Sequence, residues 1–116
     1  MSRHDDRVRL RHMLDHASEA VSLLKGKTKS QLKRTRLLQL GLMRLVEVIG
    51  EAASRISREI RVGHPEIPWE DAVGMRHKLI HDYITVDLDI LWDTVKDDLP
   101  PLIEALERIL AEEDKS

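Results

Sequence analysis

Apolar residues recur at helical spacing over most of the chain. In the clearest stretch they follow one another at intervals of three or four residues, at Leu38, Leu42, Leu45, Ile49, Ala52, Ile56 and Ile60. These intervals place the side chains on one face of an α-helix. Thr28 and Gln31 precede the stretch with the spacing of a capping box, which marks a helix start. The pattern therefore predicts a long helix that runs through Ile60.

This long helix carries more apolar surface than one packed face needs. Five more apolar residues lie beside the stripe: Leu37, Leu40, Met43, Val46 and Val48. A stripe this wide has to be covered on more than one side. Gly41 and Gly50 each cost about 1 kcal/mol against Ala inside a helix, and they are tolerated most readily where another helix crosses closely. We interpret the extra surface as a self-association face in a two-fold homodimer, the alternative being a single bundle that covers it all.

Three further helical segments have start or stop signals of their own, over about Asp5–Leu24, Trp69–Tyr83 and Leu88–Glu112. Gly26 ends the first of them, and Asp87 is placed to cap the last. Pro100 and Pro101 predict either a kink in the last segment or a fresh helix after Asp98. The whole pattern predicts an all-α bundle of four to five helices, folded as a single domain over residues 1–116.

Composition agrees with a helical domain and excludes other classes. Of the 116 residues 41% are hydrophobic, but the aromatic residues are only two Trp and one Tyr, with no Phe. A β-sandwich or barrel needs more aromatic and β-branched residues. No apolar run approaches the ~18 residues that span a bilayer, and the charged N-terminus does not have the form of a secretion signal. The absence of Cys excludes disulfides and thiolate metal sites. These features predict a cytoplasmic protein.

The net charge of −2 conceals an asymmetry between the two halves of the chain. Residues 1–61 hold 14 Lys and Arg against 7 Asp and Glu, whereas residues 62–116 hold 5 against 14, so the halves carry +7 and −9. The basic half includes Lys29, Lys33 and Arg34, in a stretch without acids. These residues form either a solvated face that the acidic half balances or a cationic surface for the phosphates of a nucleic acid.

The segment from Gly74 to Tyr83 concentrates polar groups that suit phosphodiester chemistry. Arg76 is a permanent cation whose planar fork of donors matches a phosphate. His81 gains or loses a proton near neutral pH, and Tyr83 adds a hydroxyl. On one straight helix Arg76 and His81 would lie about 140° apart around the axis, so they would not meet in one site. Either the helix is distorted, or the long side chain of Arg76 bends around the helix toward His81, or two copies of the chain combine their groups across a dimer. We favour two copies, because the long helix already calls for a partner.

These residues also have a purely structural interpretation. Arg76 and His81 could be an interfacial arginine and a satisfied histidine without turnover, and Asp82 either orients a histidine or is solvated. His77 and His81 are four residues apart, as are His12 and His16, a spacing that can hold a divalent ion on a helix. Neither pair has the Glu of the H-E-x-x-H pattern, so we expect no metal site.

Several motifs together resemble one known family. Arg76-x4-His81-x-Tyr83 resembles the R-x4-H-x-Y signature of the HEPN superfamily, in particular its HepT-like toxins. Further segments are similar to that family's pattern, in the same order along the chain: Gly50-Glu51-Ala52-Ala53, Ile67-Pro68-Trp69, Gly74-Met75-Arg76, Trp92 and Leu99-Pro100. The chain departs from the pattern at His77, where the family commonly has Asn.

The resemblance implies a helical bundle that dimerises and acts as a metal-independent endoribonuclease, with no cofactor. Arg76 would bind and neutralise the scissile phosphate. His81 would transfer protons while the adjacent 2′-hydroxyl attacks and leaves a cyclic phosphate. His77, Glu51 and Asp82 would be supporting residues.

The resemblance also implies a protein partner. Toxins of this family form a type VII-like toxin–antitoxin system with a minimal nucleotidyltransferase antitoxin, which attaches AMP to the motif tyrosine, here Tyr83. The added phosphate would bring bulk and negative charge beside Arg76 and His81. The alternative is a non-catalytic HEPN-like interaction module that docks a nucleotidyltransferase or a nucleotide.

Overall fold

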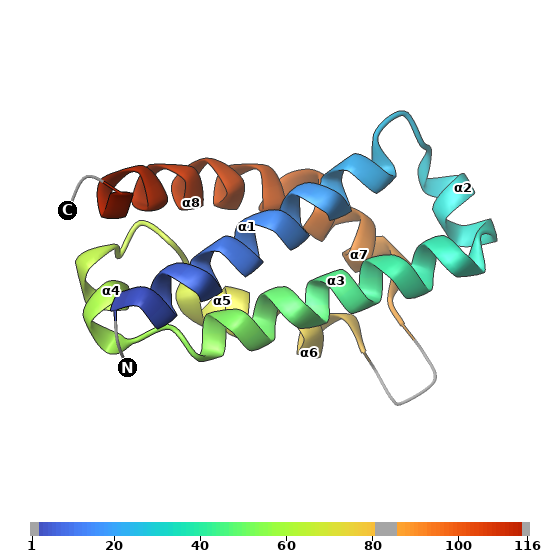
Figure 1. Ribbon diagram of the computed structural model, residues 1–116. Helices are drawn as coiled ribbons and strands as arrows, with labels where there is room; N and C mark the ends of the chain where they lie inside the picture. Colours follow the sequence, from blue (N-terminus) through green and yellow to red (C-terminus); the bar gives the residue numbers. More distant parts are fainter. Residues whose placement is uncertain (1–2, 81–85, 115–116) are drawn as a thin grey trace.

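The regular elements of the described chain are helices, as the sequence predicts. The computed structural model describes residues 3–80 and 86–114 (Figure 1). Within these ranges the one β-type pairing is an isolated antiparallel bridge between Ile80 and Val86. The helices are α1 (Arg3–Leu24), α2 (Lys29–Arg34), α3 (Arg36–Ser54), α4 (Arg58–Gly63), α5 (Trp69–Val73), α6 (Met75–Leu79), α7 (Leu88–Asp93), the π-helical turn η1 (Thr94–Asp98) and α8 (Leu99–Asp114).

The long helices α1, α3 and α8 surround the core. α1 packs against both α3 and α8, and the short helices α5 and α6 pack against α3. Figure 1 shows α4 at one end of the bundle, near the start of α1, and α2 at the other end. The largest fully buried side chains of α1, α3, α6, α7 and α8 meet in this core, among them Leu10, Met13, Leu42, Ile49, Leu79, Leu91, Leu99, Leu106 and Ile109.

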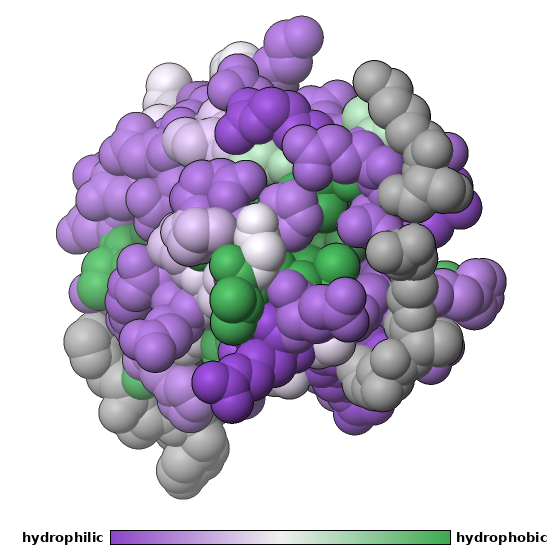
Figure 2. Space-filling view, turned by 90° about the vertical axis from the view of Figure 1, so that its left-hand side faces the viewer, coloured by the Kyte–Doolittle hydropathy of each residue, from purple (hydrophilic) through white to green (hydrophobic). Residues whose placement is uncertain are grey.

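The end of the bundle that carries α4 is mainly hydrophilic (Figure 2). Figure 2 looks onto the end that carries α4 and shows small, separate apolar patches among polar side chains. Val62 on α4 and Val8 on α1 are among the exposed apolar residues, with 67% and 39% of their surface accessible. None of the helices in the described ranges is both long and apolar enough to cross a membrane.

The predicted first helix is confirmed, and so are the stop signal after it and the capping box of the next helix. α1 ends at Leu24, and Gly26 follows with φ of +76°, a left-handed conformation that glycine adopts without strain. The capping box is also present, because the Thr28 hydroxyl accepts from the Gln31 N–H (3.1 Å) and the Gln31 side chain accepts from the Thr28 N–H (2.8 Å).

The prediction of one long helix through Ile60 is wrong, because the chain breaks this stretch twice. At the first break Thr35 is extended, and its hydroxyl donates to the carbonyl of Gln31 (2.7 Å). The Gln39 side chain then donates to the carbonyls of Leu32 (3.0 Å) and Lys33 (3.2 Å). These side chains satisfy carbonyls at the end of α2, so α2 can end and α3 can begin at a new angle.

At the second break α3 ends at Ser54, and Ser57 caps α4. Buried Asp6 on α1 accepts from both the N–H (2.9 Å) and the hydroxyl (2.6 Å) of Ser57. Arg61 donates to the carbonyls of Ala53 (2.8 Å) and Ile56 (3.2 Å), at the end of α3 and in the turn that follows it. Ile56 is still buried, so the apolar stripe continues through a turn rather than through a helix.

The two glycines of α3 differ in their surroundings. A Cβ on Gly50 would lie 3.2 Å from the carbonyl oxygens of Ala72 and Val73, so α5 crosses α3 closely there, as predicted. A Cβ on Gly41 would meet nothing within 4 Å, so no described helix of the same copy crosses α3 there, and a crossing at Gly41 stays a prediction. Its neighbours Leu37 and Leu40 are 82% and 49% exposed. This part of α3 is therefore the apolar surface that one copy of the bundle leaves uncovered.

The predicted helix over Trp69–Tyr83 is divided and shorter. Gly74 separates α5 from α6, and α6 ends at Leu79 because Ile80 is extended and pairs with Val86. Next to this bridge, the N–H of Asp87 donates to the carbonyl of Leu79 (2.7 Å), so the end of α6 is bonded to the residue that precedes α7.

In the last helical region the predicted cap is found, but no fresh helix begins after a break, because the helical conformation is continuous from Leu88 to Asp114 through η1. The side chain of Asp87 accepts from the N–H of Ile90 (3.0 Å) and so caps α7. α8 begins at Leu99, which puts Pro100 and Pro101 in its first turn, where a missing N–H costs least. Between the two helices η1 makes a π-type turn, in which the N–H of Leu99 donates to the carbonyl of Thr94.

Candidate functional site

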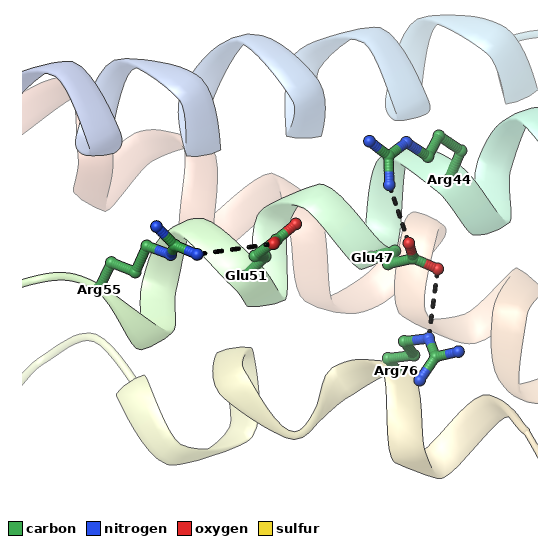
Figure 3. Close-up of polar contacts among 5 residues, drawn as sticks. All are labelled: Arg44, Glu47, Glu51, Arg55 and Arg76. Carbon is green, nitrogen blue, oxygen red and sulfur yellow. Dashed lines mark hydrogen bonds and ion pairs between the residues drawn. The ribbon is translucent and has the colours of Figure 1, made fainter.

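Arg76 lies on α6 and faces α3. Its Nε donates to one carboxylate oxygen of Glu47 (3.2 Å), and Nη1 of Arg44 donates to the other (2.8 Å). Figure 3 shows Glu47 between the two guanidinium groups, with the terminal nitrogens of Arg76 directed away from it. The Arg76 side chain is 49% exposed. The arrangement therefore fixes Arg76 through Nε and leaves its outer edge accessible to an anion.

An open groove lies beside this pair, between α3 and α6. It has a volume of about 310 Å³, and its polar walls come from Glu47, Glu51 and Ser54 on one side and Arg76 and His77 on the other. Gly50 and Val73 form the floor where α5 crosses α3 closely. Of the predicted site residues, the structure thus brings Arg76, His77 and Glu51 to one groove.

Glu51 and Glu47 play different parts in the groove. Glu51 lies 4.0 Å from Arg55 on its own helix and makes no ion pair with another described helix (Figure 3). Glu47, which contacts Arg76, is a residue that the sequence analysis missed. The spacing in the sequence pointed to this residue, because Glu47 and Glu51 are four residues apart and share the helix face that includes Gly50. A supporting role for Glu51 stays a prediction.

His81, Asp82 and Tyr83 lie outside the described residues. The estimate that Arg76 and His81 are about 140° apart assumed one straight helix. α6 ends at Leu79, before His81, so that assumption is wrong. The roles predicted for these three residues stay predictions.

The basic residues of α2 make ion pairs within the chain. Nζ of Lys33 and Nζ of Lys29 lie 2.9 and 3.4 Å from the Asp89 carboxylate on α7. Hydrogen bonds from Lys33 and Lys29 hold the pKa of Asp89 below its ordinary value. For Lys29 and Lys33 this pairing favours the alternative in which the acidic half balances the basic half. Contact of Lys29, Lys33 and Arg34 with RNA stays a prediction.

The histidine pair on α1 makes a contact within its helix. Nδ1 of His16 lies 2.7 Å from the carbonyl oxygen of His12, and the rings meet edge to face with centroids 6.3 Å apart. In residues 3–80 and 86–114, no three His, Asp or Glu side chains come together as a set that could hold a metal ion.

Comparison with known proteins identifies the family. The model of the family described as ribonuclease HepT-like matches residues 13–109. A Thermococcus cleftensis protein named "Probable ribonuclease HepT" is 37% identical over 100 residues, covering 83% of this chain and 91% of its own length. A Caldanaerobacter subterraneus protein, named as an unproven RNase, is 33% identical over 104 residues, which are 90% of this chain and 93% of that protein.

A third relative comes from Methanocaldococcus jannaschii. It is also named as an unproven RNase, and it is 31% identical over 107 residues, covering 92% of this chain and 98% of its own length. The search of solved structures gave no significant match. The family model covers most of the chain, and these relatives align over nearly their full length, so this chain belongs to the HepT-like ribonuclease family.

Proposed function

We propose that this protein is an endoribonuclease toxin that cleaves RNA without a metal ion, with Arg76 and His81 acting at a cleft between two subunits. One observation supports the proposal above the others. Arg76 is held at the edge of an open groove by a single carboxylate, with its outer donors accessible. That is the arrangement an arginine needs to receive a phosphate group.

In the proposed reaction Arg76 binds the non-bridging oxygens of the scissile phosphate. His81 accepts the proton of the adjacent 2′-hydroxyl, and the 2′-oxygen attacks phosphorus. The P–O5′ bond breaks, the protonated His81 gives its proton to the departing 5′-oxygen, and a 2′,3′-cyclic phosphate forms. Arg76 stabilises the charge that builds up on the phosphate during this step. The proton transfers use only ionisable side chains, so the scheme needs no cofactor.

The second subunit in this proposal would pack against the exposed part of α3. Leu37, Leu40, Gly41 and Arg44 have the spacing of one helix face, and the first three present apolar or open surface. This face continues into Arg44, Glu47 and Arg76. A two-fold partner on Leu37 and Leu40 would therefore bring a second groove next to the first.

Regulation by a nucleotidyltransferase antitoxin is also part of the proposal. Addition of AMP to Tyr83, two residues after His81 in the motif, would add a phosphate to the segment proposed to act on RNA. The negative charge would compete with the RNA phosphate for Arg76. Replacing Tyr83 with Phe would leave cleavage intact and remove this control. Mass spectrometry of the co-expressed proteins measures the modification.

The alternative is a non-catalytic interaction module that docks a nucleotidyltransferase or a nucleotide. The ion pair with Glu47 favours docking of the protein partner, because the phosphate of RNA or of a nucleotide has to compete with a carboxylate for Arg76. Both functions give binding, but only the first gives turnover. Cleavage of RNA therefore decides between them.

The test is an RNA cleavage assay in the presence of a chelator. The wild-type protein should cleave, and Arg76→Ala and His81→Ala should each lower the rate at least about a hundredfold. Arg108→Ala on the exposed face of α8 is the matched arginine control and should leave the rate unchanged. Circular dichroism and gel filtration check that the variants fold and associate like the wild type. Full cleavage by both variants, or no cleavage by the wild type, would overturn the proposal.

A further inference from the structure

A second hollow lies on the other side of α6 from the groove. It has a volume of about 300 Å³ and lies between the helices α5 and α6 and the chain from η1 into α8. Met75 and Lys78 of α6 face it, whereas Arg76 and His77 face the groove. We refer to it as the acidic pocket, because its carboxylates are Asp71, Asp97 and Asp98.

The acidic pocket has more negative than positive charge. Its three carboxylates are accompanied by one ammonium group, Lys78, which lies 3.6 Å from Asp71. No ion pair joins Asp97 or Asp98 to another residue of the described ranges. Partial desolvation at the edge of the pocket raises the pKa of Asp98, with Lys78 opposing the rise and the carboxylates of Asp97, Asp71 and Asp93 adding to it. The lining therefore has a formal charge of −2 that favours a cation.

Thr94 provides an independent sign that a polar ligand enters the pocket. It is only 5% exposed, and it lines the pocket from η1. A threonine in a helix commonly bonds a carbonyl of the preceding turn, but the Thr94 hydroxyl makes no hydrogen bond to any residue within 3–80 or 86–114. The hydroxyl is not among the side-chain atoms of the described residues that the protein encloses without a partner, so it is accessible from the pocket, where a ligand or water can bond to it. π-type turns such as η1 are frequent at functional sites.

The remaining walls are apolar, with Met75 and Leu102 among them. A bare divalent ion would need several oxygen ligands that converge on one point. No such set of three acidic or histidine side chains occurs in the described part of the chain. The volume is at the lower end for small-molecule pockets. An elongated organic cation with an apolar middle therefore fits better than a metal ion.

We propose that the acidic pocket binds a short linear aliphatic diamine. One ammonium would contact Asp97 and Asp98, and the Thr94 hydroxyl would accept a hydrogen bond from it. The methylene groups would pack on Met75 and Leu102, and the second ammonium would lie toward Asp71. The two positive charges match the formal charge of the lining. This site does not depend on the proposed ribonuclease function, since none of its residues line the Arg76 groove.

Isothermal titration calorimetry of the full chain with 1,4-diaminobutane tests the proposal. We expect saturable binding with one diamine per chain at physiological salt. Butylamine should bind at least about tenfold more weakly, because it loses one charge-assisted contact, and 1,4-butanediol should not bind. A further titration uses Nα-acetyl-lysine amide, which represents a basic side chain from a partner protein. If it binds as tightly as the diamine, the diamine proposal is overturned.

Variants of the lining should change the affinity in opposite directions. Asp98→Asn should weaken binding about tenfold, and Thr94→Val about threefold, because each removes one contact to an ammonium. Lys78→Met should strengthen binding about threefold, because it removes the ammonium that competes for Asp71. A gain of affinity cannot result from a failure to fold.

Glu107→Gln is the control for overall charge. Glu107 is exposed on α8 outside the pocket, and its replacement changes the net charge by the same amount as Asp98→Asn. The affinity of Glu107→Gln should equal that of the wild type. Equal weakening in Glu107→Gln and Asp98→Asn would mean diffuse attraction to an acidic surface and would overturn the proposal. The absence of saturable binding to the wild type would do the same.

Discussion

The two hollows beside α6 have similar volumes and opposite character. The groove toward α3 is open and presents the guanidinium of Arg76, whereas the acidic pocket toward η1 is more enclosed and lined by carboxylates. Both draw on a helix of only five residues, which sends Arg76 and His77 to one side and Met75 and Lys78 to the other. The net charge of −2 for the whole chain therefore says little about what either surface can bind.

The two hollows are also built on different supports. The floor of the groove depends on the close crossing of α3 and α5 at Gly50. The wall of the acidic pocket depends on η1, which provides Thr94, Asp97 and Asp98. Substitutions at Gly50 or in η1 therefore test the support of a hollow, whereas substitutions of the charged lining residues test its charge.

The largest effect should come from Gly50→Val, because it acts on the close crossing of α3 and α5 that forms the floor of the groove. The new side chain would meet the carbonyls of Ala72 and Val73 and push α5 away from α3. We expect the free energy of unfolding to fall by about 1–3 kcal/mol, as in other overpacked sites. Urea denaturation measures the change. Gly63→Val is the matched control, since the space at Gly63 is open and the residue lies outside the face proposed for the second subunit; an equal loss there would contradict the explanation.

A smaller effect should follow from Glu47→Gln, which alters the groove alone. Removal of the carboxylate ends its competition for Arg76. A DNA oligonucleotide with the base sequence of the RNA substrate cannot be cleaved, because it lacks the attacking 2′-hydroxyl. This oligonucleotide should bind about three- to tenfold more tightly to the variant than to the wild type. Fluorescence anisotropy measures the affinity, and Glu107→Gln controls for net charge. Diamine binding to the acidic pocket should not change. Unaltered or weaker oligonucleotide binding would show that Glu47 does not compete with the ligand.

Asp98→Asn should alter the pH dependence of stability by a still smaller amount. The pKa of Asp98 is raised in the folded state above its ordinary value of 3.8, so its contribution is fully present below pH 3.8 and is lost as the pH rises through the folded-state pKa. The variant should therefore be more stable than the wild type at pH 7 and equal to it near pH 3. The gain should not exceed about 0.5 kcal/mol, because Asp98 is exposed and solvent screens the charge. Thermal melts at the two pH values measure it; a loss of stability at pH 7 would contradict it.

The smallest effect concerns the basic residues of α2, which neither hollow uses. The pKa of Asp89 is lowered by Lys33 and Lys29, so this pairing stabilises the fold above the ordinary value of 3.8 and is lost as the pH falls through the folded-state pKa. Lys33→Gln should raise the NMR titration midpoint of Asp89 toward 3.8. Lys27→Gln removes a lysine that makes no ion pair with Asp89 and should leave the midpoint in place. An unmoved midpoint in Lys33→Gln would mean that the pair does not persist in solution.

The sequence predicts those parts of the fold that depend on near neighbours. Thr28 with Gln31, Asp87 with Ile90, and Gly26 after α1 each act over four residues or fewer, and all are confirmed. The end of α3 could not be predicted in this way. It depends on Asp6, which bonds Ser57 from 51 residues away, and on Arg61, which bonds carbonyls behind it. A stripe of apolar residues through Ile56 fits a helix and a packed turn equally well.

Of the candidate site, the sequence likewise predicts the residues but not the contacts between distant segments. The motif residues and Glu51 are visible as residue types at fixed spacing, but the contact between Glu47 and Arg76 joins residues 29 apart on two helices. The acidic pocket gave no signal at all in the sequence. Asp71, Thr94 and Asp98 come from separate segments, and only the packing of α5 and α6 against η1 brings them together.

The π-type turn has a further consequence for how the length of this chain can vary. A turn closed to the fifth residue holds one residue more than an α-helical path between the same two ends. Deletion of one residue within Thr94–Asp98 would restore the regular ladder and keep Leu91 and Leu106 on the buried side. The same deletion in the middle of α8 would rotate one part of its apolar face by about 100° against the other. A single-residue gap is therefore accommodated at η1 more easily than elsewhere in this helical region, at the expense of the pocket wall.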